Sequence, residues 1–371
     1  MKNILPSLPN LFLWSTSTLI GLYTLLGLVI ITAVQFMGVL INYAVSIGVG
    51  VILFNFLIGP WLMDLTLRWT YKMAWWQFDE LPMHLQNFVK DVCIKNRIKV
   101  PRFGVIEDYT PQAFTYGHTP SNGRIVITRG ILESLAPEEI EAVVAHELGH
   151  IKHWDIALMT LVQLVPLILY YIYRTLSKDS KRPSNAIAAI AYLIYIASEY
   201  VALWFSRVRE YHADRFSAFA TGNPSTLSSA LVKIAYGMSK QDASRKSDLS
   251  TGAFATMGIA SAATSNNMML VMDEDQLQID KGKLMNTLRW DLENPWAKIY
   301  EWASTHPLIA KRLKMLSLQS LFMHQEPYIP APKNRPYPYW FNFFGEFVLW
   351  ISPYLLILSA VFCLLAKRFG C

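Results

Sequence analysis

The feature that most constrains the fold is a long N-terminal stretch without charge. No Asp, Glu, Lys or Arg lies between Lys2 and Asp64, and this stretch holds two apolar segments, residues 11–36 and 39–63. Each segment exceeds the ~20 residues that a helix needs to cross the hydrocarbon core of a bilayer. A buried core helix is the alternative for any such segment. Length and absence of charge favour a membrane hairpin over residues 1–67.

Three further apolar segments follow, at residues 156–173, 186–205 and 343–365. The chain is 53% hydrophobic and only 16% charged, which is too apolar for an ordinary soluble enzyme. A short polar loop separates the first two of these segments, so they predict a hairpin that returns to the side where it started. Glu199 lies inside the second segment, where a charge costs about 3 kcal/mol unless it is paired or hydrated. A buried partner and partial insertion of the hairpin both remain open.

The distribution of basic residues predicts which side of the membrane the polar parts occupy. Residues 68–152 contain ten Lys and Arg, whereas the loop between the first two apolar segments contains none. The positive-inside rule therefore places residues 68–152 in the cytoplasm. Basic residues around the loop at 177–184, and Lys367 and Arg368 after the last segment, run against a simple assignment. Complete crossing of the hairpin and the side of the C-terminus thus stay open. The net charge of +6 is scattered beside apolar segments, which argues against a nucleic-acid partner.

A short motif before the third apolar segment carries metal-binding chemistry. Residues 137–150 are predicted to be helical, because a proline, then acidic residues and then apolar residues at helical spacing follow one another. On this helix His146 and His150 lie one turn apart on one face, so both imidazoles can bind one zinc ion. Glu147 can address a water on that ion. Chance occurrence of so short a motif is the alternative, and a catalytic zinc requires a third protein ligand.

The third ligand is predicted at Glu210. His150 lies six residues before the hairpin and Glu210 five residues after it, so both are within about 10 Å of the same membrane boundary. Glu210 and Asp214 are spaced i and i+4 and share a helix face. We assign Glu210 to zinc and Asp214 to a hydrogen bond with a ligand histidine, which fixes its tautomer. An exposed helix with charge pairs is the alternative. His212, on another face, and His153 are less suitable ligands.

Three separated motifs in this order resemble those of the HtpX/CAAX prenyl endopeptidase family of integral-membrane gluzincin metalloproteases. They are the His146–His150 motif, the hydrophobic hairpin and the segment of residues 206–214. The resemblance covers about residues 80 to 320. It implies one Zn²⁺ per chain bound by His146, His150 and Glu210, with Glu147 as the general base. The predicted fold is mainly α, with integral-membrane helices, a helical zincin catalytic domain and a small antiparallel β-sheet.

Two weaker matches belong to the same resemblance. Residues 110–117, including Gln112, Ala113 and Phe114, resemble a strand that pairs with substrate; here Gln112 replaces the usual asparagine. From the residues alone, this segment is a strand in a small sheet with residues 103–107 and 124–128. The Thr-His-Pro segment at 305–307, followed by Arg312, resembles a late motif whose His306 or Arg312 stabilises an oxyanion. A surface helix that starts at the proline is the alternative.

These expectations divide the chain into five parts. They are an N-terminal membrane hairpin (1–67), a first catalytic part (68–155), a central hydrophobic hairpin (156–205), a second catalytic part (206–340) and a C-terminal membrane helix (341–371). The predicted protein is a multi-pass zinc metalloendopeptidase of the bacterial inner membrane. Its partners are the bilayer and peptide or protein substrates, chiefly membrane proteins, and its active site is cytoplasmic. Quality control is the expected role.

Three other functions remain as alternatives. A processing protease with one defined substrate fits the resemblance, and a non-catalytic zinc-binding membrane scaffold fits the metal ligands. Glu147 argues against the scaffold, because a binding-only site needs no base. A transporter is disfavoured, since the apolar segments carry few mid-membrane charges or helix breaks. Residues 241–291 are expected to form a variable loop or a cover over the cleft.

Overall fold

The protein is mainly helical, as expected. The computed structural model describes residues 5–37, 41–178, 185–244, 281–330 and 339–369. Long helices cover all five apolar segments: α1 (Leu11–Met37), α2 (Ile41–Thr70), α6 (Asp155–Lys178), α7 (Asn185–Thr221) and α14 (Tyr339–Phe369). Within the described side chains, three helical stretches are long and apolar enough to cross a membrane, at Leu11–Thr32, Asp155–Arg174 and Ala188–Thr221. Spans over α2 and α14 stay predictions.

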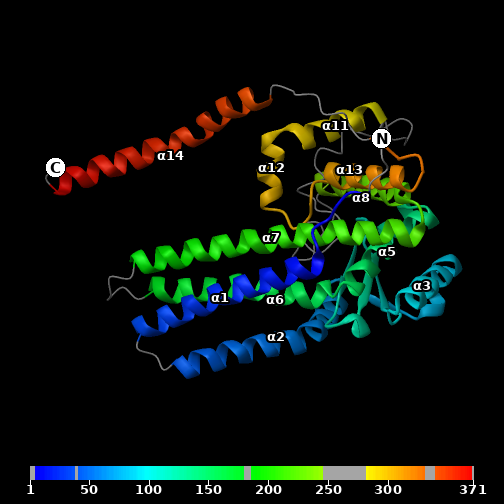
Figure 1. Ribbon diagram of the computed structural model, residues 1–371, viewed down its shortest axis with the longest axis horizontal. Helices are drawn as coiled ribbons and strands as arrows, with labels where there is room; N and C mark the ends of the chain where they lie inside the picture. Colours follow the sequence, from blue (N-terminus) through cyan, green and yellow to red (C-terminus); the bar gives the residue numbers. More distant parts are fainter. Residues whose placement is uncertain (1–4, 38–40, 179–184, 245–280, 331–338, 370–371) are drawn as a thin grey trace.

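Four of the long helices lie side by side at one end of the molecule. In Figure 1, α1, α2, α6 and α7 extend together away from the part that holds the sheet, while α14 runs separately from them. The contacts among α1, α6 and α7 are apolar and buried, with Leu22, Val162 and Phe205 among them. The Tyr23 hydroxyl donates to the Leu161 carbonyl oxygen over 3.1 Å, so a polar group within the bundle is satisfied by a neighbouring helix.

The small sheet has four strands in the order β1-β2-β4-β3 and is mixed. Its strands are β1 (Ala74–Trp76), β2 (Arg102–Ile106), β3 (Ala113–Tyr116) and β4 (Arg124–Thr128). The expected small antiparallel sheet is present but mixed: β1–β2 and β3–β4 pair antiparallel, whereas β2 and β4 pair in parallel. After β2 the chain passes to the outer edge, forms β3 in the opposite direction, and returns through residues 117–123 as β4 between β3 and β2. The antiparallel β3–β4 hairpin therefore forces the parallel pair.

The central helix of the polar part is α5 (Pro137–Lys152), which is buried on nearly all sides. Pro137 occupies its first turn, and the Glu139 carboxylate accepts from the Ala136 backbone N–H over 2.8 Å. Its neighbours are β3, α3 (Met83–Asn96), α7 and α8 (Pro224–Ser244). The apolar residues between these helices form one core with buried side chains of α11 (Lys281–Glu293) and α13 (Ile309–Phe322). The remaining helices of the described residues are α4 (Arg129–Ser134), α12 (Pro295–Trp302) and the short 3-10 helices η1 (Phe78–Glu80) and η2 (Pro120–Asn122).

Helix α2 is fixed to the sheet by an ion pair between Asp64 and the buried Arg124. Arg124 of β4 is 2% exposed, and its Nε lies 2.8 Å from a carboxylate oxygen of Asp64. The Tyr116 hydroxyl donates to the same carboxylate over 2.7 Å. Burial and the neighbouring Asp64 charge raise the pKa of Tyr116 well above its usual value, so the phenol keeps its proton. The C-terminal half of α2 thus packs as part of the catalytic body.

The segment before α1 lies against α7. His212 Nε2 is 3.0 Å from the Pro9 carbonyl oxygen, and the Arg215 guanidinium donates to the Pro6 carbonyl oxygen. Both contacts occur on the helix that carries Glu210 and Asp214. The segment of residues 241–291, expected to be variable, lies largely outside the described residues; its two ends belong to α8 and α11.

Candidate active site

Two neighbouring helices bring the predicted ligands together. His146 and His150 come from α5, and Glu210 comes from α7; their donor atoms all lie within 4.8 Å of one another. The two imidazole Nε2 atoms are 3.1 Å apart. A Glu210 carboxylate oxygen lies 3.5 Å from the His146 Nε2, and the other lies 3.4 Å from the His150 Nε2. The helical repeat of α5 aligns the histidines, and the packing of α7 on α5 supplies the acid.

Each imidazole faces a second carboxylate on its other nitrogen. His146 Nδ1 lies 3.0 Å from an Asp214 oxygen, and His150 Nδ1 lies 2.6 Å from an Asp155 oxygen. These carboxylates favour the proton on Nδ1 and leave a lone pair on each Nε2. Two lone pairs 3.1 Å apart repel each other, so the arrangement needs a cation between them.

The donor geometry and the charge both fit a divalent metal ion. Ligands at ~2.1 Å from a tetrahedral metal lie about 3.4 Å from each other. The two imidazole Nε2 atoms are 3.1 Å apart, and each faces a different Glu210 oxygen at 3.5 and 3.4 Å, so the carboxylate can offer either oxygen to a shared ion. The buried or nearly buried charges around the site are four carboxylates and two guanidinium groups, namely Glu147, Asp155, Glu210, Asp214, Arg209 and Arg312. The excess of two negative charges is the charge that a divalent cation neutralises.

Protons compete for the same donors. Burial lowers the pKa of His146, but contacts with the Asp214 and Glu210 carboxylates outweigh it and raise the pKa above the ordinary histidine value. The same balance, with Glu210 as the largest favourable contribution, raises the pKa of His150. The electrostatic field of the site therefore favours positive charge at the point where the three donors meet.

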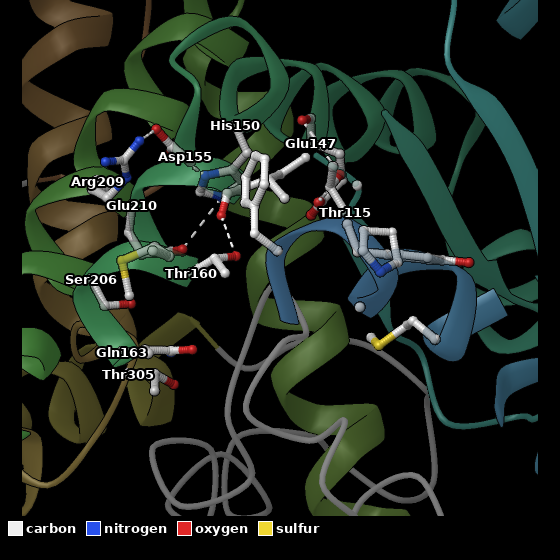
Figure 2. A pocket seen from close by; sticks show the side chains of 18 of the residues that line it. Thr115, Glu147, His150, Asp155, Thr160, Gln163, Ser206, Arg209, Glu210 and Thr305 are labelled. Atoms are coloured by element: carbon white, nitrogen blue, oxygen red, sulfur yellow. Dashed lines mark hydrogen bonds and ion pairs between the residues drawn. The ribbon is translucent and has the colours of Figure 1, made fainter. Parts of the chain in front are cut away.

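Glu147 borders the cavity beside this triangle. Its carboxylate accepts a hydrogen bond from the Thr115 hydroxyl over 2.7 Å, and both residues line a cavity of about 490 Å³. Figure 2 shows Thr115 and Glu147 on one side of this cavity, with Glu210 on the other and His150 between them. The hydrogen bond holds one carboxylate oxygen while the carboxylate still borders the space that a substrate would enter.

The late motif contributes one residue to the cavity and one to its support. His306 lines the cavity, and its Nδ1 lies 3.1 Å from a Glu210 oxygen. Arg312 is fully buried behind the ligands, where its guanidinium donates to both Asp214 oxygens over 2.6 and 2.9 Å. Arg312 is not among the residues that line the cavity. Of these two residues, His306 therefore borders the cavity and Arg312 does not. The alternative of a surface helix was wrong, because Pro307 is buried and α13 begins at Ile309.

Only the C-terminal end of the predicted substrate strand reaches the cavity. Gln112 precedes β3 and is 2% exposed, with its amide nitrogen 3.6 Å from the Met238 sulfur. Ala113 and Phe114 are likewise buried, so none of these three side chains lines the cavity. Thr115, with Tyr116 and Gly117 after it, does line the cavity. In the described sheet, β3 is an edge strand beside α5.

Sequence reasoning missed three residues around the site. Asp155 holds one ligand histidine, Arg209 pairs with Asp155 and donates to the His153 carbonyl oxygen, and Thr115 holds the predicted base. An acid five residues after His150, at the start of an apolar hairpin, was the available signal for the first. The two rival histidines, His153 and His212, do not join the donor cluster. His212 contacts the Pro9 carbonyl oxygen, and the centroids of the His153 and His212 rings are 6.1 Å apart.

Comparisons with known proteins place the chain in a family. Residues 78–319 match the description "Peptidase family M48", a stretch that includes both histidines, Glu210, His306 and Arg312. The chain belongs to peptidase family M48. The predicted family resemblance is thereby confirmed, and the chain is a membrane metalloprotease by family.

Several curated proteins resemble this M48 member. A protease HtpX homolog of Methanothermobacter thermautotrophicus is 38% identical over 193 residues, 52% of this chain and 73% of the relative. A protease HtpX homolog of Aeropyrum pernix is 30% identical over 244 residues, 62% of this chain and 72% of the relative. The protease HtpX homolog 2 of Methanosarcina acetivorans is 33% identical over 180 residues, 46% of this chain and 61% of the relative.

Among solved structures, the crystal structure of S. mikatae Ste24p matches with a TM-score of 0.45 and 13% identity. That match covers 82% of this chain and 65% of Ste24p.

Proposed function

We propose that this M48 member is a zinc-dependent endopeptidase that hydrolyses peptide bonds of membrane or membrane-associated proteins. The observation that carries the proposal is the position of Glu147. Its carboxylate borders a large cavity, beside two imidazoles and a carboxylate whose spacing suits one divalent ion. A site that only binds metal needs no such base, which disfavours the scaffold alternative. His146, His150 and Glu210 are the proposed ligands, for one Zn²⁺ per chain.

The chemistry follows from these positions. Zinc, when bound, lowers the pKa of water toward 7 and polarises a carbonyl group. Glu147 is proposed to accept the proton from the attacking water and later to deliver it to the leaving nitrogen. Thr115 orients that carboxylate through its 2.7 Å hydrogen bond. His306, which lines the cavity, is proposed to donate to the oxygen that becomes negative in the transition state.

Asp214, Asp155 and Arg312 act by positioning the proposed ligands. Asp214 and Asp155 hold the ligand imidazoles, and Arg312 neutralises Asp214 while approaching Glu210. An extended substrate is proposed to pair with the outer edge of β3, of which Thr115 is a part. Backbone pairing of this kind tolerates many sequences, which suits a quality-control protease.

The relatives named protease HtpX homolog support quality control over the rival role of a dedicated processing protease. We place the site on the cytoplasmic side of a bacterial inner membrane, since the basic residues gather in the polar part that holds it. Comparative proteomics of membranes that contain the native chain or its Glu147→Gln form separates the two roles. Many accumulating membrane proteins support quality control, and a single accumulating precursor supports processing.

The mechanism itself is tested by purified variants. Glu147→Gln should retain zinc and lose peptide cleavage, because it keeps the shape of the side chain and removes the base. Glu141→Gln is the matched control, since Glu141 lies on the same helix and pairs with His84 instead. Glu210→Ala should lower the zinc content. Cleavage by the Glu147→Gln protein at the native rate would reject the assigned base, and full zinc content in Glu210→Ala would reject the third ligand.

A further inference from the structure

The cavity extends beyond the level that tryptophans mark on the membrane helices. Trp61 of α2 and Trp154, just before α6, are about half exposed, and the rings of Trp14 and Trp204 meet at 4.9 Å. Trp14 and Trp154 lie at the starts of α1 and α6, Trp61 lies three residues before Asp64, which pairs with the sheet, and Trp204 lies six residues before the proposed ligand Glu210. Tryptophan is enriched where a bilayer meets water, so these residues mark the membrane interface on that side.

The lining residues run past this level on two helices. On α6 they extend from Asp155 to Gln163, eight residues and about 12 Å along the axis. On α2 they reach Phe56, five residues beyond Trp61 and so about 7 Å deeper. The cavity therefore begins at the proposed zinc site and continues into the part of the bundle that the hydrocarbon surrounds.

The walls of the cavity differ in polarity. Apolar side chains line the walls formed by α2 and the start of α6, with Phe56, Pro60, Met63, Ile156 and Met159. Polar side chains gather elsewhere: Figure 2 shows Gln163, Ser206 and Thr305 together below Glu210, with Thr160 beside them. The Thr160 hydroxyl donates to the Ile156 carbonyl oxygen over 2.9 Å and keeps its capacity to accept.

The polar side chains of this cavity have a specific use. Gln163 lies nine residues past Trp154, and Ser206 lies two residues on the catalytic side of Trp204. A peptide that leaves the helical conformation inside the hydrocarbon exposes N–H and C=O groups, each of which costs several kcal/mol without a partner. The Gln163 amide offers donors and acceptors, and the Ser206 hydroxyl offers one donor and acceptor sites. Ser206 lies one turn before Glu210 on α7, so this polar strip leads directly to the proposed ligands.

We propose that the cavity receives the unwound end of a substrate's transmembrane helix. Gln163 and Ser206 hydrogen-bond its backbone, and the apolar wall takes its side chains. This inference rests on the proposed endopeptidase function and names its substrate class: proteins whose scissile bond lies within about two helical turns of a membrane span, a reach set by the rise of 1.5 Å per residue. Gln163 and Ser206 then determine specificity for anchored substrates.

The test compares three substrates that share one scissile sequence, with the protein reconstituted in proteoliposomes. One is a soluble peptide, one is fused directly to a model transmembrane helix, and one is fused through a long Gly/Ser linker that behaves as a flexible coil. The Gln163→Leu/Ser206→Ala double variant should lower the ratio of kcat/KM for the direct fusion over the soluble peptide on the order of tenfold, the loss expected for two peptide hydrogen bonds. The linker fusion should follow the soluble peptide.

The control variant is Thr32→Val, which removes an exposed hydroxyl from α1 away from the cavity. It should leave the ratio unchanged. An unchanged ratio in the double variant, or an equal loss on all three substrates, overturns the inference. The proposed function is judged separately by cleavage of the soluble peptide by the native protein and its absence in Glu147→Gln. If the native protein cleaves none of the three, both proposals are rejected.

Discussion

Replacing Gly149 by alanine should weaken metal binding without unfolding the protein. A Cβ atom on Gly149 would lie 3.1 Å from the Ala213 Cα and 3.2 Å from two side-chain carbons of Phe216. Carbon atoms pack at about 3.5–4.0 Å, so α5 and α7 must separate there by roughly 0.5 Å. His150 follows Gly149 on one helix, and Glu210 lies one turn before Ala213 on the other. The substitution therefore spreads the donor triangle.

The magnitude follows from two opposing free energies. Overpacking costs about 1–3 kcal/mol, whereas alanine in place of glycine within a helix stabilises the fold by about 1 kcal/mol. The melting temperature should consequently change little. The overpacking displaces the ligands and so lowers zinc affinity, whereas the gain in helix propensity leaves zinc affinity unchanged. A loss of about 1.4–2.8 kcal/mol in binding free energy corresponds to a tenfold to hundredfold higher Kd.

The assay is a competition between the protein and a chromogenic zinc chelator at fixed pH, with residual peptide cleavage measured in parallel. Gly21→Ala on α1 serves as the control, because no atom lies within 4 Å of the Cβ that the substitution adds. It should leave the Kd of zinc unchanged. A Gly149→Ala protein that binds zinc as tightly as the native protein would refute the claim that the close approach of α5 and α7 sets the site.

Three other changes have distinct expected outcomes. Asp155→Asn removes the carboxylate that orients one ligand imidazole and should weaken zinc binding about 10- to 100-fold, measured by the same competition. Arg124→Leu removes the buried partner of Asp64, whose own side chain is 18% exposed, and should cost about 1–3 kcal/mol of unfolding free energy. Arg129→Leu, at an exposed pair, should cost under about 1 kcal/mol in the same denaturation series. Burial and the nearby positive charges lower the pKa of His153 to about 4. The unfolded chain binds this proton below about pH 6.5 and the folded chain does not, so stability falls as pH drops from 6.5 toward 4. His153→Gln should reduce that loss in thermal melts.

The parts of the site that follow from local rules could be predicted from the sequence. The helical repeat puts His146 and His150 on one face, and a hairpin that returns to its starting side brings Glu210 near them; the structure places all three together. The long helices over the apolar segments follow from length and composition alone. These inferences require only the periodicity of the helix and the thickness of a bilayer.

The parts of the site that depend on tertiary packing could not be predicted from the sequence. The pairing of Thr115 with Glu147 depends on the strand order of the sheet, which the sequence did not show. The parallel pairing of β2 and β4 was likewise not predicted, because a hairpin alone does not say which strand it joins. The late sequence motif singled out Arg312 but did not show where its side chain lies. Its burial behind Asp214 follows from how α13 packs on α7, which no local pattern encodes.

The ion pair between Asp64 and Arg124 has a practical consequence for anyone who wishes to work with a soluble fragment. A truncation that starts after α2 would leave a buried guanidinium without its carboxylate and would also strip Phe56, Pro60 and Met63 from the cavity. A lone buried charge of this kind is strongly destabilising. The catalytic body therefore cannot be cut free of its first hairpin as a trimmed enzyme, and detergent or lipid has to accompany it through purification.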